Sequence, residues 1–332
     1  IKKLEYQMNL HENKTLFQQA VRFTAQEMKI PDLYIEKDYW VTFALKQIFS
    51  EETKEYCVFK GGTALSKCYG IVERFSEDID LVIMKTGEES ANQLKNRLKK
   101  VSQILEKHLP EVAVTNITQK MGMNRKTAHT YSKEFQGNYG QIRDVIIVEA
   151  SWLGYYEPYE QKKVHTFISE MMLRSGQENL IEEYGLQEFP VNVLKLERTF
   201  CEKIMSLVRF SYSEDYIEDL KSKIRHTYDL HQMLQQKEIL DFFESEDFEK
   251  MLNKVGQDDV ASYKNDNEWL KFHPKDSRFF AKLDEIWTQL EPTYKTDFRN
   301  LVYGELPDTE KVKLSLERLK YRIEKIKWRV KV

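Results

Sequence analysis

The chain has 332 residues, of which 41% are hydrophobic and 32% charged, and it contains only 12 glycines and 7 prolines. This composition is typical of an ordered globular protein with one large domain or two, and it excludes a disordered or collagen-like chain. The formal net charge of −3 excludes a surface that is basic overall, so any contact with nucleic acid has to be local.

The three cysteines, Cys57, Cys68 and Cys201, are an odd number without Cys-x-x-Cys spacing. They argue against a disulfide framework and against a structural zinc site. No apolar run reaches the length of a membrane helix and no signal-peptide pattern opens the chain, so we expect a cytoplasmic protein without a membrane partner. Because the chain begins at Ile1, we also expect that it has been trimmed or processed.

The first fifty residues predict two helices. Apolar side chains recur at helical spacing in residues 15–28, and Pro31 and Asp32 mark the break that follows. Residues 36–49 continue with a second helix that has one apolar face. We interpret the aromatic side chains of this second helix as ordinary core.

The stretch 56–83 predicts a compact unit of two strands around a helix. An apolar strand is expected at 56–59, and the turn Gly61-Gly62-Thr63 then opens a short helix that ends near residue 69. Glycines let the backbone approach a ligand closely, and a helix N-terminus offers unpaired N–H groups and a positive dipole end. The turn is therefore typical of a phosphate cradle, although the same residues also form tight turns that bind nothing.

A pair of carboxylates follows at the head of the second strand, 79–83. Asp78 and Asp80 are two residues apart, and side chains alternate between faces along a strand, so both carboxylates point the same way. Such a pair suits a hard divalent cation, Mg²⁺ or Mn²⁺, that also binds phosphate oxygens. Alone it could be a solvated strand end; beside the glycine turn it favours a metal and phosphate site.

These two motifs resemble those of a known family. The matching segments are K-G-G-T-A-L at 60–65 and R-F-S-E-D-I-D-L at 74–81. They resemble the AbiEii/AbiGii-type toxin nucleotidyltransferases, which belong to the DNA polymerase β-like superfamily and supply the toxins of type IV toxin–antitoxin pairs. The segment 36–40 also resembles the usual N-terminal segment of the family. The resemblance implies an α/β nucleotidyltransferase domain with a mixed sheet, followed by a mainly α-helical domain that closes over the active site.

A long polar helix and three strands are expected between residues 88 and 152. The helix is predicted at 88–108, with a basic patch at 95–100, and the strands at 112–117, 128–135 and 142–152, the last two joined by a turn at 137–140.

The superfamily uses a third strand carboxylate beside the Asp-x-Asp pair. Glu149, which follows four apolar residues, is our candidate for this metal ligand. Asp144, at the other end of the same apolar run, is the alternative. A strand-end residue in solvent, without a metal, is the third possibility that the sequence leaves open.

The composition becomes helical from Leu194 onward, and Pro190 lies near the change. We therefore predict a nucleotidyltransferase domain at 1–190 and a helical domain at 191–332. On the apolar stripe of the helix at 194–209, Lys203 occupies a position where another leucine would be expected. An unpaired buried charge is costly, so this lysine has to pair, border a cleft, or extend its amine past the edge of the stripe.

Two later segments resemble further motifs of the family. Glu197-Arg198 followed by Glu202-Lys203 resembles the second motif, whose lysine meets the nucleotide phosphates. Arg198 and Glu202 are also i,i+4 neighbours beside that lysine. The segment R-H-T-Y-D at 225–229 has the form of a later motif whose aspartate lies at the active site, which implies that role for Asp229. The alternative for its arginine and aspartate is a surface pair worth about 0.3–0.5 kcal/mol, and the histidine is expected to pack or orient.

The C-terminal third predicts further helices and one basic segment. Five aromatic residues are expected in the core: Trp269, Phe272, Phe279, Phe280 and Trp287. A last amphipathic helix is predicted at 308–329, and residues 311–332 hold nine Lys or Arg and two Glu, a net charge of +7. We expect this segment to hold a nucleic-acid acceptor, with the patch at 95–100 as the second choice; a solubilising helix is the alternative.

Taken with the resemblance, these patterns predict a toxin nucleotidyltransferase. It would transfer a nucleoside monophosphate from an NTP to an acceptor, by resemblance the 3′ end of tRNA, and so block translation, with a cognate antitoxin encoded nearby. The expected catalytic residues are Asp78, Asp80, Lys203 and Asp229. The expected nucleotide-binding residues are Gly61, Gly62, Thr63, Lys67, Ser76, Glu202 and Arg225. The alternatives are a protein or small-molecule acceptor, or a nucleotide-binding protein without catalysis.

Overall fold

The structure is a computed structural model that describes residues 8–120, 122–137 and 143–332. The chain divides into two compact units, each of which is described by itself. The sheet unit comprises Ile1–Cys68, Phe75–Trp152 and Gln161–Val193, and the helical unit comprises Tyr69–Arg74, Leu153–Glu160 and Leu194–Val332. The predicted assignment of functions to residues 1–190 and 191–332 stays a prediction.

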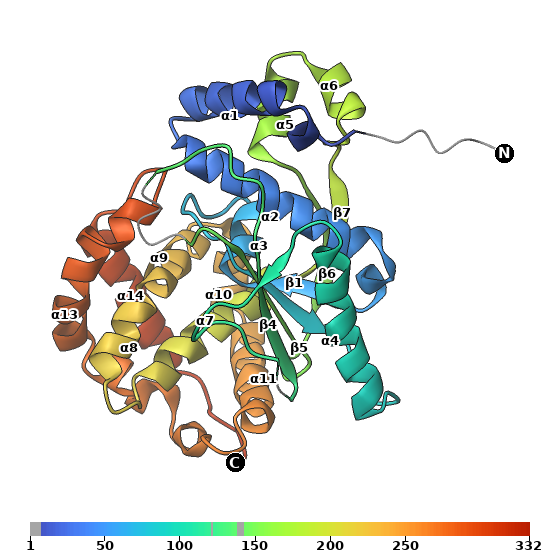
Figure 1. The fold of residues 1–332 in the computed structure, drawn as a ribbon. Coiled ribbons are helices and arrows are strands. Elements are labelled where there is room, and N and C mark those ends of the chain that lie inside the picture. The colour runs from blue at the N-terminus through green and yellow to red at the C-terminus, as the bar shows by residue number, and fades with distance from the viewer. Residues whose placement is uncertain (1–7, 121, 138–142) are drawn as a thin grey trace. The chain divides into compact units, whose positions relative to one another are not determined.

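In the described part of the chain, seven strands form one mixed sheet in the order β3-β4-β5-β2-β1-β7-β6 (Figure 1). The strands are β1 (Cys57–Lys60), β2 (Ile79–Ile83), β3 (Glu111–Val112), β4 (Asn124–His129), β5 (Ile146–Ser151), β6 (Tyr159–Val164) and β7 (Phe189–Leu194). β2 runs parallel to β5 and antiparallel to β1, while β4 runs antiparallel to β5. The predicted mixed sheet, followed by a mainly helical part, is confirmed.

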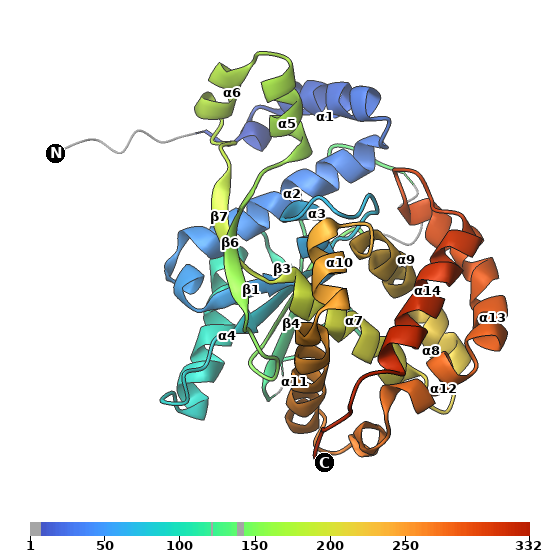
Figure 2. The same ribbon diagram turned by 180° about the vertical axis from the view of Figure 1, so that it is seen from behind.

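The helices fall into two groups along the chain (Figure 2). Those of the sheet unit are α1 (Lys14–Met28), α2 (Asp32–Ser50), α3 (Gly61–Lys67), α4 (Ala91–Glu106), α5 (Phe167–Arg174) and α6 (Glu178–Glu183). Those of the helical unit are α7 (Leu196–Phe210), α8 (Tyr216–Ser222), α9 (Ile224–Met233), α10 (Lys237–Glu244), α11 (Glu246–Ser262), α12 (Arg278–Ala281), α13 (Leu283–Lys295) and α14 (Thr309–Ile323). None of the helices in the described ranges is long and apolar enough to cross a membrane.

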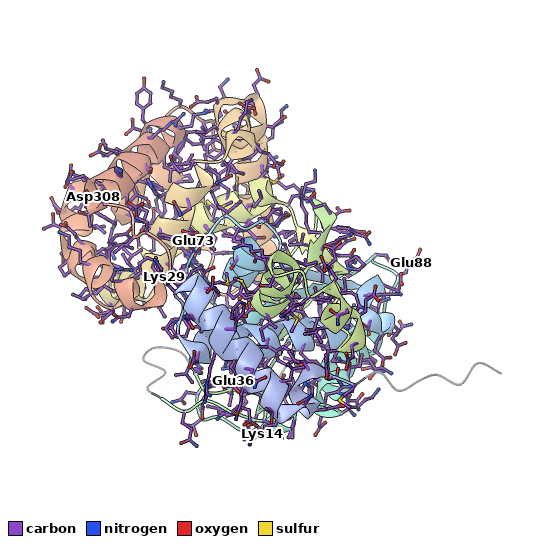
Figure 3. All side chains as sticks on the ribbon, turned by 90° about the horizontal axis from the view of Figure 1, so that it is seen from above. Lys14, Lys29, Glu36, Glu73, Glu88 and Asp308 are labelled. Carbon is purple, nitrogen blue, oxygen red and sulfur yellow. The ribbon has the colours of Figure 1, made fainter. Side chains whose placement is uncertain are left out.

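Helix α2 buries three consecutive charged residues, Glu36, Lys37 and Asp38; Figure 3 labels Glu36 on this helix. Each of them holds a different segment of the sheet unit. Glu36 accepts the backbone N–H groups of Glu134 and Phe135. Lys37 donates to the carbonyls of Arg143 and Val145. Asp38 pairs with the Lys67 ammonium and accepts the Phe167 N–H. Because buried charges need such partners, α2 fixes the loops around the sheet.

Several predicted elements differ from the observed ones. β4 covers 124–129 instead of 128–135, because its first residues are polar and carry site side chains rather than an apolar face. Of the strand expected at 112–117, only Val112 pairs with a neighbouring strand, as the second residue of β3. The sequence also did not predict β6, whose alternating exposed residues lie at the sheet edge, or β7, whose Pro190 was interpreted as a boundary. Most of the turn expected at 137–140 and the start of the strand expected at 142 lie outside the described residues.

The core of the helical unit holds most of the predicted aromatic residues. Trp269, Phe279, Phe280 and Trp287 are at most 5% exposed. The prediction is wrong for Phe272, which is 55% exposed and stacks on Tyr212. It follows Leu270 and Lys271 at the end of the short 3-10 turn Glu268–Lys271, on the surface of the unit.

Candidate active site

A row of four charged residues crosses the centre of the sheet. Lys60 on β1 is in register with Asp80 on β2, Asp80 with Glu149 on β5, and Glu149 with Lys126 on β4. Residues in register on neighbouring strands point to the same face. The row therefore places two carboxylates side by side between two lysines, and Asp78 lies on the same face because it is two residues before Asp80.

Glu149 and Asp144, the two candidates for the third carboxylate, lie in different surroundings. Glu149 accepts a hydrogen bond from Asn124 Nδ2 at 3.0 Å and one from Lys126 Nζ at 2.9 Å. Asp144 lies before β5, its side chain is 61% exposed, and it pairs with Lys133 at 2.7 Å. Of these two carboxylates, Glu149 is the one in register with Asp80. Its role as a metal ligand stays a prediction.

Gly61 is the point of closest approach between the glycine turn and the carboxylates. Its φ of +83° belongs to the left-handed region that favours glycine. A Cβ atom built on Gly61 would overlap the Asp80 carboxylate, so no other residue fits without movement of that side chain. α3 has only seven residues and ends before residue 69, so its dipole is small and the close glycine backbone is the stronger feature of this turn.

Thr63 and Ser76 fasten the turn to the strand that carries the carboxylates. The buried Thr63 hydroxyl donates to the carbonyl oxygen of Asp78 at 2.6 Å and lies 2.9 Å from Ser76 Oγ. The structure thus brings together Gly61, Thr63, Ser76 and Asp78, which were all expected in the site from the sequence. It adds a positioning role for Thr63 to the predicted phosphate contact.

Asp80 and Glu149 lie in different electrostatic environments. Burial raises the pKa of Asp80 to about 6, and the negative charges of Asp78 and Glu149 add to the rise. Burial acts in the same direction on Glu149, but the Lys126 ammonium lowers its pKa below the ordinary value. A divalent cation between Asp78 and Asp80 would relieve this repulsion and hold both groups ionised. The donor set therefore fits a hard cation.

The protein side chains alone would not supply a complete set of metal ligands. Among the His, Cys, Asp and Glu side chains in the described ranges, no group of three or more is arranged to hold a metal ion. Two carboxylates with open positions are what Mg²⁺ uses when substrate phosphates and water supply the remaining oxygens. The arrangement fits a cation that arrives with a nucleotide rather than a permanently bound one.

The sequence did not predict the buried ion pair between Lys37 and Glu77, the residue before Asp78. Glu77 lies 3.5 Å from Lys37 and accepts the Arg143 N–H at 2.9 Å, while Arg143 Nη1 lies 3.3 Å from Asp78 Oδ1. Burial raises the pKa of Glu77 to about 7 and lowers the pKa of Lys37 to about 8. This network supports the strand entry at Asp78. The sequence of the acidic segment 77–80 could not predict this network, because the partners of Glu77 are Lys37 on α2 and Arg143 before β5.

Lys67, predicted to bind nucleotide, is engaged inside the sheet unit. Its ammonium forms an ion pair with Asp38 and donates to the carbonyl oxygen of His165 at 3.0 Å, and its side chain is 6% exposed. In this arrangement Lys67 joins α3 to α2. Its binding of nucleotide stays a prediction and would require it to leave Asp38.

A second charged cluster lies in the helical unit, around Asp229 on α9. Arg74 binds both oxygens of this carboxylate, with Nε at 2.6 Å from Oδ1 and Nη2 at 2.7 Å from Oδ2. Lys203 on α7 donates to Oδ2 at 2.7 Å. Asp229 is 0% exposed, which excludes the surface pair that the sequence left open. Lys203 faces inward on the apolar stripe of α7 and finds its partner here.

Burial and charge act in opposite directions in this cluster. Burial alone would raise the pKa of Asp229, but Arg74 and Lys203 lower it below the ordinary carboxyl value. Burial lowers the pKa of Lys203, although Asp229 opposes that shift. Burial also lowers the pKa of His226 well below the ordinary value, which favours the uncharged ring. His226 Nδ1 lies 3.4 Å from Lys203 Nζ. The cluster therefore keeps an ionised carboxylate between two cations.

Gly62 lies in the first turn of α3, and the predicted residues Glu202 and Arg225 lie on α7 and α9. Glu202 accepts a hydrogen bond from Arg198 Nε at 3.0 Å, and Arg198 also pairs with Asp258 at 2.8 Å. Arg225 is half-buried one turn before Asp229, and its positive charge contributes to the lowered pKa values of Lys203 and His226. The sequence missed Arg74 as the main partner of Asp229, because the two residues are 155 positions apart.

The chain was compared with known proteins. The family described as "Nucleotidyl transferase AbiEii toxin, Type IV TA system" matches residues 44–322, which include both charged clusters. Among solved structures, the chain is similar to MenT4, a nucleotidyltransferase toxin from Mycobacterium tuberculosis H37Rv, with 16% sequence identity, a TM-score of 0.46, and coverage of 90% of this chain and 98% of that one. No curated protein sequence matches the chain. Since the family match spans most of its length, the chain belongs to the AbiEii nucleotidyltransferase toxin family of type IV toxin–antitoxin systems.

Proposed function

We propose that this toxin transfers a nucleoside monophosphate from an NTP to the 3′ end of tRNA in a reaction that depends on Mg²⁺ or Mn²⁺, and so blocks translation. The 3′ hydroxyl oxygen bonds to the α-phosphorus, the bond from that phosphorus to the oxygen bridging to the β-phosphate breaks, and the β- and γ-phosphates leave together as pyrophosphate. The hydroxyl proton is lost to solvent or to a basic group. A cognate antitoxin, expected from the family, would hold this activity in check.

The observation that carries the proposal is the placement of Asp78 and Asp80 on one face of the sheet, with the Gly61 backbone against Asp80. A divalent cation bound there with the nucleotide would supply positive charge to the attacking and leaving oxygens. The chain's own contribution is to hold two carboxylates close together in spite of their repulsion. The hydrogen bond from Thr63 to the Asp78 carbonyl supports that geometry.

The remaining residues are assigned from their motifs. Gly62 and Thr63 would contact the outer phosphates of the nucleotide. Lys203 would neutralise charge on the triphosphate, which is the role that the resemblance gives to this lysine. Asp229 would keep Lys203 charged in spite of its burial, since it is the carboxylate that binds the ammonium. That makes Asp229 a positioning residue whose oxygens are already occupied by Lys203 and Arg74.

A labelling experiment tests the proposal. The toxin is incubated with each of the four α-labelled NTPs, Mg²⁺ and total RNA, and the products are separated by gel. The proposal expects label in tRNA alone, lost after removal of terminal nucleotides from the 3′ end. The Asp80→Asn variant serves as the control that lacks the metal carboxylate and should give no label.

Other outcomes would replace the proposal with one of its alternatives. Label in protein or in a small molecule, with none in tRNA, would identify a nucleotidyltransferase with another acceptor. Binding of NTP without any Mg²⁺- or Mn²⁺-dependent pyrophosphate release would identify a nucleotide-binding protein without catalysis. In either case the tRNA assignment fails.

A further inference from the structure

The basic C-terminal segment is not uniform in the structure. The predicted apolar face of α14 is confirmed, since Val312, Leu316, Leu319 and Ile323 are fully buried. Many basic side chains of this helix, however, already have partners in the helical unit. Lys313 pairs with Asp284, Arg318 pairs with Glu244, and Arg322 donates to the carbonyls of Phe243 and Ser245. Much of the positive charge of α14 is therefore already paired within the helical unit. The helix ends at residue 323 instead of 329.

The segment after α14 is different, because it lies along helix α11 as a non-helical strap, residues 327–331 (Figures 1 and 2). Three polar side chains four residues apart on α11 hold its backbone. Glu249 accepts the N–H of Lys327, Asn253 binds the Lys327 carbonyl and the Arg329 N–H, and Gln257 binds both backbone groups of Lys331. These hydrogen bonds measure 2.7–3.1 Å.

The spacing of these contacts fixes the strap in an extended form. Four residues of an α-helix rise by about 6 Å, and two residues of an extended chain advance by about 6.6 Å. Asn253 and Gln257 therefore meet every second residue of the strap. Trp328 and Val330 turn inward onto Gly256, where a Cβ atom would overlap the Trp328 ring and lie 2.8 Å from a Val330 methyl group. Trp328 Nε1 also donates to the Leu270 carbonyl at 2.9 Å.

The result is a row of three exposed basic side chains, Lys327, Arg329 and Lys331, which we call the basic ladder. Arg329 lies 3.5 Å from Glu249 and is 69% exposed. The other two have no ion pair within the described part of the chain. Because the backbone is clamped at every second residue, the three charges are held at a regular interval of about 6.6 Å.

We infer that the basic ladder binds the sugar–phosphate backbone of a single-stranded RNA segment; this rests on the proposed function, in which the acceptor is RNA. A net-negative protein has to concentrate positive charge where RNA approaches. Phosphates along an extended strand repeat at an interval that alternate residues of an extended peptide can follow, and a clamped strap loses little conformational freedom on binding. Contacts of this kind need no base readout.

Neutralisation of the ladder tests the charge requirement. The variant Lys327→Gln, Arg329→Gln, Lys331→Gln is compared with a control, Lys237→Gln, Lys282→Gln, Lys295→Gln, which removes the same charge from exposed side chains paired with their own helices. Affinity for a short labelled single-stranded RNA is measured between about 50 and 200 mM salt. The ladder variant should bind about tenfold more weakly, with a salt slope shallower by about 2, and the control should keep the parental slope.

A second variant tests the clamp without changing any charge. Asn253→Ala with Gln257→Ala removes the hydrogen bonds to Arg329 and Lys331. We expect RNA affinity to fall several-fold with an unchanged salt slope, because the three cations remain but lose their fixed spacing. Unchanged affinity in this variant would overturn the ladder as a built surface, and so would an unchanged slope in the charge variant.

Two further outcomes distinguish a failure of the ladder inference from a failure of the proposed function. If the parent toxin labels tRNA while the ladder variant keeps the parental KM for tRNA, the ladder inference fails and the proposed function stands. If RNA binds through the ladder but receives no label, the proposed function fails and the ladder stands. Binding of polyglutamate instead of RNA, lost in the ladder variant, would assign the surface to an acidic protein partner and overturn the inference.

Discussion

At the scale of single residues, Gly61 lies against the Asp80 carboxylate of the candidate site. Its positive φ and the neighbouring Asp80 carboxylate exclude a side chain for two separate reasons. We predict that Gly61→Ala abolishes nucleotidyl transfer and lowers the free energy of unfolding by about 1–3 kcal/mol. Transfer assays and thermal unfolding check both effects.

Gly87→Ala is the matched control for that prediction. Gly87 also has a positive φ, +94°, but a Cβ built on it would meet no atom within 4 Å. It should lose stability through backbone strain alone and keep its activity. If Gly61→Ala transfers nucleotide as well as Gly87→Ala does, the contact between Gly61 and Asp80 has no role in catalysis.

The ion pair of Asp229 with Arg74 and Lys203 predicts a pH-dependent contribution to stability. The pKa of Asp229 is lower in the folded protein than its unfolded value of about 3.9. A depressed carboxyl pKa stabilises the fold above the unfolded pKa, and that stability is lost as the pH falls through the folded pKa. Asp229→Asn should cost about 3–5 kcal/mol at neutral pH, because it leaves two buried cations without their carboxylate.

Denaturant unfolding at several pH values measures this contribution. The stability difference between the parent and Asp229→Asn should be constant above about pH 5 and should shrink below about pH 4. The exposed pair of Lys237 with Asp241 offers a control, since Asp241→Asn should change stability by less than about 1 kcal/mol. A difference between the parent and Asp229→Asn that stays the same down to pH 3 would contradict the assigned ion pair.

At the scale of elements, helix α2 supports the segment that carries Asp78 and Asp80, because its Lys37 pairs with Glu77. This lysine is 0% exposed and joins Glu77 to the carbonyls of Arg143 and Val145. We predict that Lys37→Met lowers the free energy of unfolding by about 3–5 kcal/mol, because the buried Glu77 carboxylate keeps only the half-exposed Arg143 as a counter-charge. The double variant Lys37→Met, Glu77→Gln should recover part of this loss. Full stability in Lys37→Met would mean that the lysine only fills space.

The sequence predicted the elements whose signals are local. The strand at Asp80, the inward position of Lys203 and the apolar face of α14 all follow from spacing within one element. The sequence could not predict contacts between distant segments, such as Arg74 with Asp229, because nothing near Arg74 marks its partner. It also missed β6, whose edge position removes the apolar alternation by which a strand is recognised.

The basic C-terminus shows a similar limit. The sequence places a net charge of +7 in residues 311–332. It does not show which of these charges are paired with other parts of the folded chain. Arg322 resembles Arg329 in the sequence, yet Arg322 is bound to the carbonyls of Phe243 and Ser245, while Arg329 is exposed on a clamped strap. That difference depends on α10 and α11, which the charge count does not include.

At the scale of the whole molecule, the charged groups form two clusters, one within each unit. The sheet unit holds Asp78, Asp80 and Glu149 on one face of its sheet, and the helical unit holds Lys203 and Asp229. Each cluster is assembled by contacts inside its own unit. Single substitutions in either unit therefore test the function of that cluster without disturbing the supporting contacts of the other.

The central claim is that the Asp-x-Asp strand provides the metal carboxylates for transfer. The most direct measurement is Mg²⁺-dependent pyrophosphate release by the parent, by Asp80→Asn and by Asp144→Asn. Asp144 is the matched control, because it is a carboxylate before β5 that is exposed and paired with Lys133. We predict that Asp80→Asn releases no pyrophosphate while it melts within a few degrees of the parent, and that Asp144→Asn retains activity. Turnover at the parental rate in Asp80→Asn would contradict the account.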